Sequence, residues 1–250
     1  MQIRLFILVA ITFLLCSCDN SSQLTIYTAN KILTMNAAQP NATAVAVLND
    51  KIFAVGTLQE VIEKSQAYTQ VIDHRFAEKT ILPGFIEPHL HPAIAGLLLP
   101  MEFITPHDWN LPGKSVKGVK TPAGYLKRLI QYEASLDQDD WLWSWGYHNL
   151  FHGDLSRQML DEISTTRPII VWHRSFHEIF VNTAAIEQLG IEQSDNPQAD
   201  FARGHFFENG LFDITDKITP ILTSPLRYLG ALKHAAKIIH AGGVTTVSDG

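Results

Sequence analysis

Short apolar strands alternate with amphipathic helices from residue 80 to the end of the chain. Strands are predicted at residues 81–86, 168–172 and 243–247. Helices are predicted to begin at Thr121-Pro122 and Ser224-Pro225, because each pair places a hydroxyl residue before a proline in the first turn. Parallel strands need long crossover connections, which are usually helical. The alternation therefore predicts parallel βαβ units in an α/β fold.

A smaller β-rich segment, residues 24–80, precedes these units. Residues 44–48 and 51–55 are apolar runs separated by two turn-forming residues, which predicts a β-hairpin. Thr57 followed by Glu60 predicts a capping box that opens a short helix. Some 50 residues of this kind make too small a core to fold comfortably alone. We therefore expect this segment to pack against the chain that follows it.

Composition excludes several classes of protein. The chain is 46% hydrophobic and 18% charged, which is an ordinary globular composition and excludes wholesale disorder. Its net charge of −6 gives no general electrostatic attraction for nucleic acid, so no nucleic-acid partner is expected. Both cysteines lie within the first 18 residues, which excludes a disulfide scaffold and a cysteine-ligated zinc site in the body. Eleven histidines remain as candidate ligands.

Residues 1–18 are predicted to be a secretion signal. Arg4 supplies the positive start, and residues 5–15 form an eleven-residue apolar run that is shorter than a membrane-spanning helix. The end of this run, Leu-Cys-Ser-Cys, resembles a bacterial lipobox in which Cys18 is acylated. An ordinary cleaved signal with two incidental cysteines is the alternative. Acylation implies a lipid-anchored protein of the cell envelope, on the periplasmic or outer side of a membrane.

The motif that carries chemistry lies at residues 83–92. Side chains two apart on a strand point to the same face, so His89 and His91 are expected to project together from the end of an apolar strand. Two imidazoles about 7 Å apart along one face can reach a single divalent ion. Glu87 is expected on that face, and Pro92 ends the strand. Parallel α/β folds place their sites at such strand ends.

Four segments resemble the amidohydrolase superfamily. Pro-Gly-Phe-Ile-Glu-Pro-His-Leu-His at residues 83–91 is similar to the signature of its first barrel strand, although Glu87 replaces the usual aspartate. Residues 44–56 resemble the small β-sandwich that precedes that strand. Residues 174–186 and 243–249 are similar to stretches of the amidohydrolase 3 (YtcJ-like) branch. The resemblance covers most of the chain after the signal segment.

This resemblance implies a distorted TIM barrel of which only the first strands are present. Residues 24–80 are then part of the β-sandwich subdomain, and residues 81–250 are the N-terminal part of a metal-dependent hydrolase barrel. A barrel needs about eight strand–helix units, so the chain is expected to be part of a larger protein.

The resemblance also implies a site for one or two divalent metals, with zinc as the expected ion. His89 and His91 would be the first two ligands. The substrate would be a small molecule with a non-peptide amide or related C–N bond, attacked by metal-activated water. The remaining ligands and the general base are expected beyond Gly250, so the 250 residues alone are expected to lack hydrolase activity.

Four further residues are weaker candidates. His177 and Arg174 are proposed to contact substrate; the alternatives are a loop histidine bonded to backbone and a structural ion pair. Glu208 either approaches the metal or is a solvated loop carboxylate. Asp249 either belongs to the site or caps a following helix.

Two classes of function fit these observations. The first is a metal-dependent amidohydrolase represented by its N-terminal half. The second is a catalytically inactive lipoprotein, either a truncated product or a binding module. The reading frame after codon 250 distinguishes them, because further lysine and histidine strands there favour the enzyme.

Overall fold

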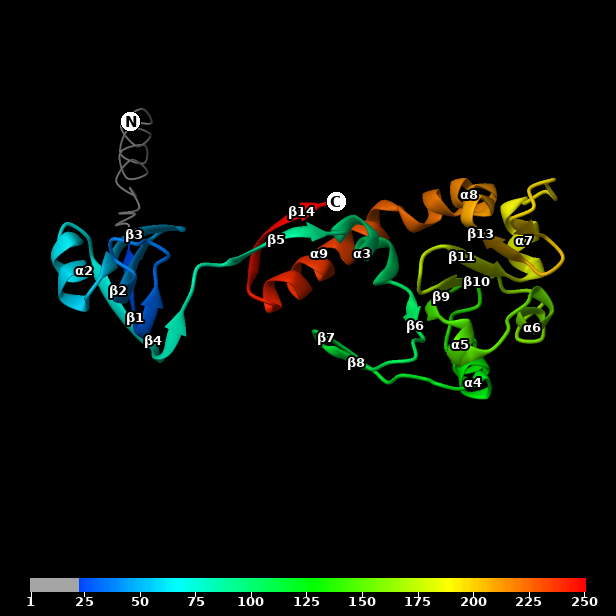
Figure 1. The fold of residues 1–250 in the computed structure, drawn as a ribbon, viewed down its shortest axis with the longest axis horizontal. Coiled ribbons are helices and arrows are strands. Elements are labelled where there is room, and N and C mark those ends of the chain that lie inside the picture. Colours follow the sequence, from blue (N-terminus) through cyan, green and yellow to red (C-terminus); the bar gives the residue numbers. More distant parts are fainter. Residues whose placement is uncertain (1–22) are drawn as a thin grey trace, which may run out of the picture. The chain divides into compact units, whose positions relative to one another are not determined.

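The computed structural model describes residues 23–250, and the predicted signal segment with Cys18 lies outside them. The described chain separates into two compact units, which meet in the sequence between Gly84 and Phe85. The first unit contains the β-rich segment, and the second contains the alternating strands and helices (Figure 1).

A four-stranded sheet forms the first unit, in the order β3-β2-β1-β4. Its central strand β1 pairs with β2 in antiparallel and with β4 in parallel orientation, and β3 is antiparallel to β2. The strands are β1 (Leu24–Leu33), β2 (Asn41–Leu48), β3 (Lys51–Gly56) and β4 (Gln70–Ile81).

The predicted hairpin and capping box are both confirmed. Strands β2 and β3 are joined at Asn49, which adopts φ 57°, a left-handed conformation that asparagine tolerates better than most residues. Helix α2 (Leu58–Lys64) begins after Thr57. The Thr57 hydroxyl accepts from the amide of Glu60, and the Glu60 carboxylate accepts from the amide of Thr57.

Apolar side chains lie on both faces of this sheet. Leu24 and Ile26 are buried beneath helix α2 together with Val61, whereas Ala29 and Val45 belong to a cluster on the opposite face. The alternation of side chains along each strand produces this division. A sandwich consists of two packed sheets, and residues 23–84 form one sheet covered by one helix on one face.

The His-x-His segment of the second unit lies on a pair of parallel strands. Strand β5 (Phe85–Leu90) pairs with β14 (Val244–Asp249), and the two run side by side in Figure 1. Helices α3 (Pro92–Leu98) and α9 (Pro225–Ala241) pack against each other. A Cβ atom at Gly96 of α3 would lie 2.8 Å from the Tyr228 ring and 2.9 Å from Leu232, so this close packing needs glycine.

The strand expected over residues 81–86 is interrupted. Strand β4 ends at Ile81 and β5 begins at Phe85. Pro83 lacks a backbone N–H and Gly84 lacks a Cβ atom, and both residues weaken a strand at its interior.

A separate six-stranded sheet contains most of the other strands of this unit, in the order β12-β13-β11-β10-β9-β6. Strands β6, β9 and β10 are parallel, whereas β11, β13 and β12 continue the sheet in antiparallel pairs. The strands are β6 (Glu102–Phe103), β9 (Leu142–Tyr147), β10 (Ile169–His173), β11 (Glu178–Val181), β12 (Ala199–Asp200) and β13 (His205–Phe207).

This arrangement differs from the expectation that the strands of residues 81–250 form one barrel sheet. Within residues 23–250, β5 and β14 form a parallel pair, and the β6–β9–β10 strands belong to the other sheet. The connection from β10 to β11 is a short turn at residues 174–177. So short a connection cannot cross over the sheet, and β11 therefore returns antiparallel to β10.

Helices and a short hairpin surround the six-stranded sheet. Thr121 caps its helix as predicted, whereas the Ser224 side chain makes no cap hydrogen bond to α9. Ser156 and Asn182 cap two further helices. The remaining elements are the hairpin β7 (Trp109–Leu111) and β8 (Lys114–Val116), the helices α4 (Pro122–Glu133), α5 (Asn149–His152), α6 (Arg157–Asp161), α7 (Thr183–Leu189) and α8 (Phe212–Leu222), and the 3-10 helix η1 (Glu208–Leu211).

The core of the second unit lies on both faces of β9 and β10. Trp143 and Ile170 face one apolar cluster, and Leu142 and Val171 face the other. Every residue of β9 is buried, as expected for a parallel strand covered on both faces.

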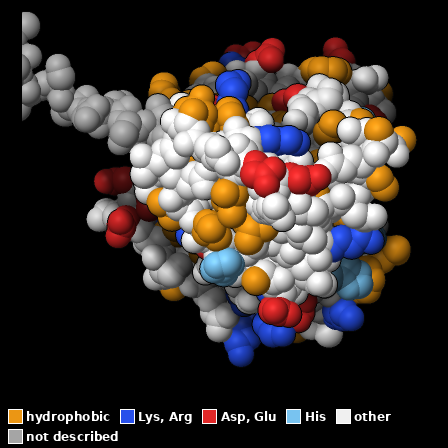
Figure 2. All heavy atoms as spheres, turned by 90° about the vertical axis from the view of Figure 1, so that its left-hand side faces the viewer, with side chains coloured by type: hydrophobic (Ala, Val, Ile, Leu, Met, Phe, Trp, Pro, Cys, Tyr) orange, Lys and Arg blue, Asp and Glu red, His pale blue; other side chains and the backbone are white. Residues whose placement is uncertain are grey.

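Charged side chains are spread over the face of the molecule that Figure 2 shows. On the face that Figure 2 shows, acidic and basic side chains are interspersed, and hydrophobic side chains form small groups. None of the helices in residues 23–250 combines the length and hydropathy that a membrane-spanning segment needs.

Candidate functional site

His89 and His91 lie together at the carboxyl end of β5. His89 is on the strand, whereas His91 follows its last residue and is the N-cap residue of α3. The prediction that both lie on the strand is therefore correct for His89 alone. Their rings nevertheless lie 4.8 Å apart between centroids and are inclined at 81°. The two imidazoles are adjacent donors of the kind that divalent zinc prefers.

The neighbouring strand brings Asp249 to the same place. Asp249 pairs in register with Leu90, and its Oδ1 lies 4.0 Å from Nδ1 of His91. Asp249 thus faces the histidine pair, which favours the first of its two predicted roles.

The backbone of Gly250 lies close to both rings. A Cβ atom at Gly250 would lie 2.9 Å from Nδ1 of His89 and 3.6 Å from Cε1 of His91. The amide of Gly250 donates to the carbonyl of Leu90 at 3.1 Å, which fixes the backbone at this point. A side chain at residue 250 would therefore press on the His89 ring, so this close approach needs glycine.

Glu87 has a local role in this strand. Its Oε1 accepts from the backbone amide of His89 at 3.1 Å. Pro88 has no backbone N–H to donate to a neighbouring strand. The hydrogen bond between the Glu87 carboxylate and the next amide stabilises the strand at this point, just before the histidines.

The donor set fits part of a metal site. Among the residues that the structure describes, no group of three or more His, Cys, Asp or Glu side chains is arranged to hold a metal ion. A catalytic zinc site commonly uses about three protein ligands and keeps one position open for water. His89 and His91 have the right chemistry for two of these ligands.

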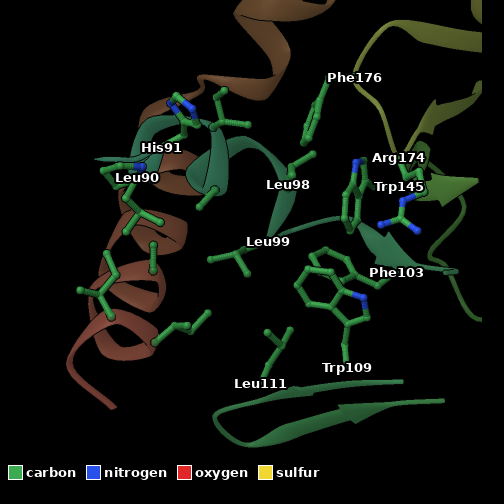
Figure 3. A pocket seen from close by; sticks show the side chains of 16 residues that line it. Leu90, His91, Leu98, Leu99, Phe103, Trp109, Leu111, Trp145, Arg174 and Phe176 are labelled. Atoms are coloured by element: carbon green, nitrogen blue, oxygen red, sulfur yellow. The ribbon is translucent and has the colours of Figure 1, made fainter. Parts of the chain in front are cut away.

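A cavity of about 670 Å³ begins at His91. Figure 3 shows His91 on one side of it and Arg174 on the other. Helices α3 and α9 form one apolar wall, and aromatic rings form the facing wall. The aromatic residues are Phe103, Trp109, Trp145 and Phe176. The volume is within the range of small-molecule sites.

The short turn between β10 and β11 carries two of the lining residues, Arg174 and Phe176. Phe176 adopts φ 68°, a strained conformation for a bulky residue. The amide of Ser175 donates to Nδ1 of His173 at 3.1 Å, and the amide of Phe176 donates to the carbonyl of His173 at 3.1 Å. His173 therefore holds this turn in place.

His173 is buried and belongs to a histidine cluster. Glu178 Oε2 lies 2.9 Å from Nε2 of His205, and Glu178 Oε1 lies 4.0 Å from Nδ1 of His173. Burial lowers the pKa of both imidazoles, and the Glu178 carboxylate opposes that shift. Since Nδ1 of His173 accepts hydrogen bonds, its neutral form carries the proton on Nε2, which has no partner among the described residues.

His177 and Glu208 form an exposed pair, with Nδ1 of His177 3.2 Å from Oε2 of Glu208. Neither residue lines the cavity beside His91. Arg174 does line the cavity. Of the two residues predicted to contact substrate, Arg174 therefore lies at this site and His177 does not. For Glu208, the structure favours the loop-carboxylate alternative.

The aromatic lining of the cavity has no recognisable signal in the sequence. Trp109 comes from the hairpin, Trp145 from β9 and Phe176 from the turn after β10. These residues are so far apart in the sequence that no regular spacing indicates that they share a cavity. The positive φ of a phenylalanine has no sequence signature either.

The parallel strands and the paired histidines at a strand end define an α/β protein with a candidate metal centre. The sequence pattern of the amidohydrolase family (Amidohydro_3) matches residues 76–250. The chain belongs to this family, and family membership supports its assignment as a hydrolase at the level of the family.

Three curated relatives are similar to parts of the chain. The exoenzymes regulatory protein AepA of Pectobacterium carotovorum subsp. carotovorum is 28% identical over 74% of this chain and 38% of its own length. The N-substituted formamide deformylase of Arthrobacter pascens is 28% identical over 64% of this chain and 28% of its own. The protein LONG AFTER FAR-RED 3 of Arabidopsis thaliana is 23% identical over 89% and 37%. The chain thus spans well under half the length of these relatives.

Two solved structures share the fold. Uncharacterized metal-dependent hydrolases from Pyrococcus horikoshii OT3 and Pyrococcus furiosus superpose with TM-scores of 0.69 and 0.68, each at 18% identity. Each superposition covers 90% of this chain, with 42% and 43% of the respective neighbours. Similarity at this identity establishes the fold.

Proposed function

We propose that this protein is a metal-dependent hydrolase that cleaves carbon–nitrogen bonds of non-peptide amides. One observation carries the proposal: the adjacent imidazoles of His89 and His91, with the carboxylate of Asp249 on the next parallel strand. Membership of the amidohydrolase family supports it, as do solved neighbours described as metal-dependent hydrolases. A relative named for deformylation of N-substituted formamides supports the C–N bond as the target.

His89 and His91 would hold the divalent metal, with zinc as the expected ion for imidazole ligands. A bound metal of this kind polarises a carbonyl and makes hydroxide available near neutral pH. Asp249 lies on the Nδ1 side of His91 and orients that ring. The cavity beside His91 would exclude water from a small apolar substrate, with Arg174 on its far side; a substrate contact by His177 stays a prediction.

Metal content and turnover test this proposal together. The protein is loaded with zinc, and bound metal is measured by elemental analysis for wild type, His89→Ala and His91→Ala. We expect each variant to lose metal. In a longer protein that also supplies the ligands and the general base expected after Gly250, we expect each variant to lose hydrolysis of a panel of N-substituted formamides and N-acyl amines. His107→Ala is a matched control, because the His107 ring packs edge to face on Phe151 and does not line the cavity. Unchanged metal content in both His variants would contradict the assignment of the ligands.

We also propose that Cys18 is acylated and anchors the protein in the cell envelope, on the periplasmic or outer side. The eleven-residue apolar run and the Leu-Cys-Ser-Cys sequence support this proposal.

A further inference from the structure

We propose that the substrates are amides with an aryl or alkyl body and an anionic group at the end remote from the scissile bond, and that Arg174 binds that anionic group. The proposal rests on the proposed function for the position of the scissile bond. The rest of it follows from the cavity and from the turn that carries Arg174 and Phe176.

The walls of the cavity select an apolar body. Leu98 and Ile239 belong to the helical wall, and the rings of Phe103, Trp109 and Trp145 face them. Trp109 packs edge to face on both other rings, Phe103 and Trp145 are tilted against each other by 59°, and the centroids lie 5.0 to 5.6 Å apart. Such a rigid aromatic surface buries a flat apolar group at little cost in conformational entropy.

Arg174 gives the cavity a charged end. Arg174 is exposed, and its guanidinium forms no salt bridge with any acidic side chain of residues 23–250. It lies across the cavity from His91 in Figure 3. A guanidinium binds a carboxylate through two parallel hydrogen bonds, which fixes the orientation of the ligand. A ligand that fills the apolar space and ends in a carboxylate would thus place its other end toward His91.

The backbone between β10 and β11 supports this assignment. Phe176 holds φ 68° although a bulky residue disfavours it, and its ring lies 5.8 Å from that of Trp145. Such strain persists only where the surroundings enforce it, and it concentrates at binding sites. Here the buried His173 accepts from the amide of Ser175, between the two lining residues. The turn is thereby built to present Arg174 and Phe176 to the same cavity.

Binding of two matched probes tests the proposal without depending on catalysis. The probes are 4-phenylbutyrate and 4-phenyl-1-butanol, which share the aryl body and contain no C–N bond. Isothermal titration calorimetry on the purified protein gives their affinities. We expect 4-phenylbutyrate to bind about tenfold more tightly than the alcohol, since a charge-assisted bond is added. Arg174→Gln should abolish this preference and leave binding of the alcohol unchanged.

Two further variants complete the experiment. Phe176→Gly keeps the turn, because glycine adopts positive φ without strain, and should weaken both probes alike. Arg75→Gln changes an exposed arginine of the first unit that does not line the cavity, and should leave both affinities unchanged. Equal affinity of the two probes for wild type, or a preference that survives Arg174→Gln, would overturn the proposal. Absence of binding by either probe would overturn it too, because the cavity would then not accept an aryl ligand.

The same variants separate this inference from the proposed function. If the probes behave as expected but His89→Ala and His91→Ala keep the metal content of wild type, the cavity binds anionic ligands and the proposed function fails. If amides are hydrolysed and Arg174→Gln leaves the KM of carboxylated and uncarboxylated amides equally unchanged, the proposed function stands and this inference fails.

Discussion

Nδ1 of His91 lies 4.0 Å from Oδ1 of Asp249, across two parallel strands that are more than 150 residues apart in the sequence. A carboxylate on the Nδ1 side of an imidazole favours the tautomer with its proton on Nδ1. That tautomer leaves Nε2 free as a metal donor. We therefore expect Asp249, at the end of β14, to orient this proposed ligand at the end of β5.

Asp249→Asn tests this relationship. We expect the affinity for zinc to fall about tenfold or more, because loss of an orienting carboxylate weakens a metal-bound histidine by this order. Competition with a chromophoric zinc chelator measures the affinity. Asp195→Asn is the matched control, since Asp195 lies exposed in the segment before β12. Equal zinc affinities for Asp249→Asn and wild type would show that the carboxylate does not orient His91.

Asn182 provides a prediction about stability. Its side chain is fully buried; Oδ1 accepts from the amides of Ile169 and Ala185, and Nδ2 donates to the carbonyls of Ser164 and Arg167. Asn182→Ala leaves these buried groups without partners, so the free energy of unfolding should fall by about 3 kcal/mol. Urea denaturation measures it.

Asn209→Ala is the control for this variant, because the Asn209 side chain makes no such buried hydrogen bonds among the described residues. A loss below about 1 kcal/mol in Asn182→Ala would mean that water replaces the lost hydrogen bonds.

The buried histidines predict a loss of stability in acid. The pKa values of His152, His173 and His205 are all lowered, in each case first by burial. In the unfolded chain these groups bind protons at higher pH than in the fold. Their neutral forms therefore contribute full stability above the ordinary histidine pKa of about 6.5, and this contribution is lost as pH falls through the lowered values. Urea midpoints at pH 7.5 and 5.0 should show the decrease.

His173→Asn isolates one part of this effect. Asparagine does not titrate, so the decrease in stability between the two pH values should become smaller than in wild type. His240→Asn, a change at the end of α9, is the control and should leave the decrease as it is. If His173→Asn and wild type lose the same stability in acid, the proton uptake lies at other groups.

The proposed lipid anchor predicts covalent acylation at Cys18. Metabolic labelling with an alkyne fatty acid should mark wild type and Cys16→Ala, because Cys16 lies before the cleavage site of the proposed lipobox. Cys18→Ala should lose the label. Equal labelling of wild type and Cys18→Ala would exclude Cys18 as the modified residue.

Local patterns in the sequence were sufficient for many elements of the fold. The capping box of Thr57 and Glu60 and the start of α4 after Thr121 were both predicted and are both present. These features depend on hydrogen bonds between residues three or four positions apart, so a short stretch of sequence specifies them completely. The His-x-His pair could also be identified locally, because both histidines lie within one short motif.

The tertiary structure decided which strands pair and what surrounds His91. The sequence predicted β5 and β10 as strands of one barrel, yet β5 pairs with β14 while β9 and β10 belong to another sheet. Pairing over long separations depends on the entropy of closing loops and on the packing of whole faces, which local patterns do not encode. The same holds for the cavity. The two histidines could be identified from a short stretch of sequence, whereas the packing of distant elements places Trp109, Trp145 and Arg174 around the cavity that His91 lines.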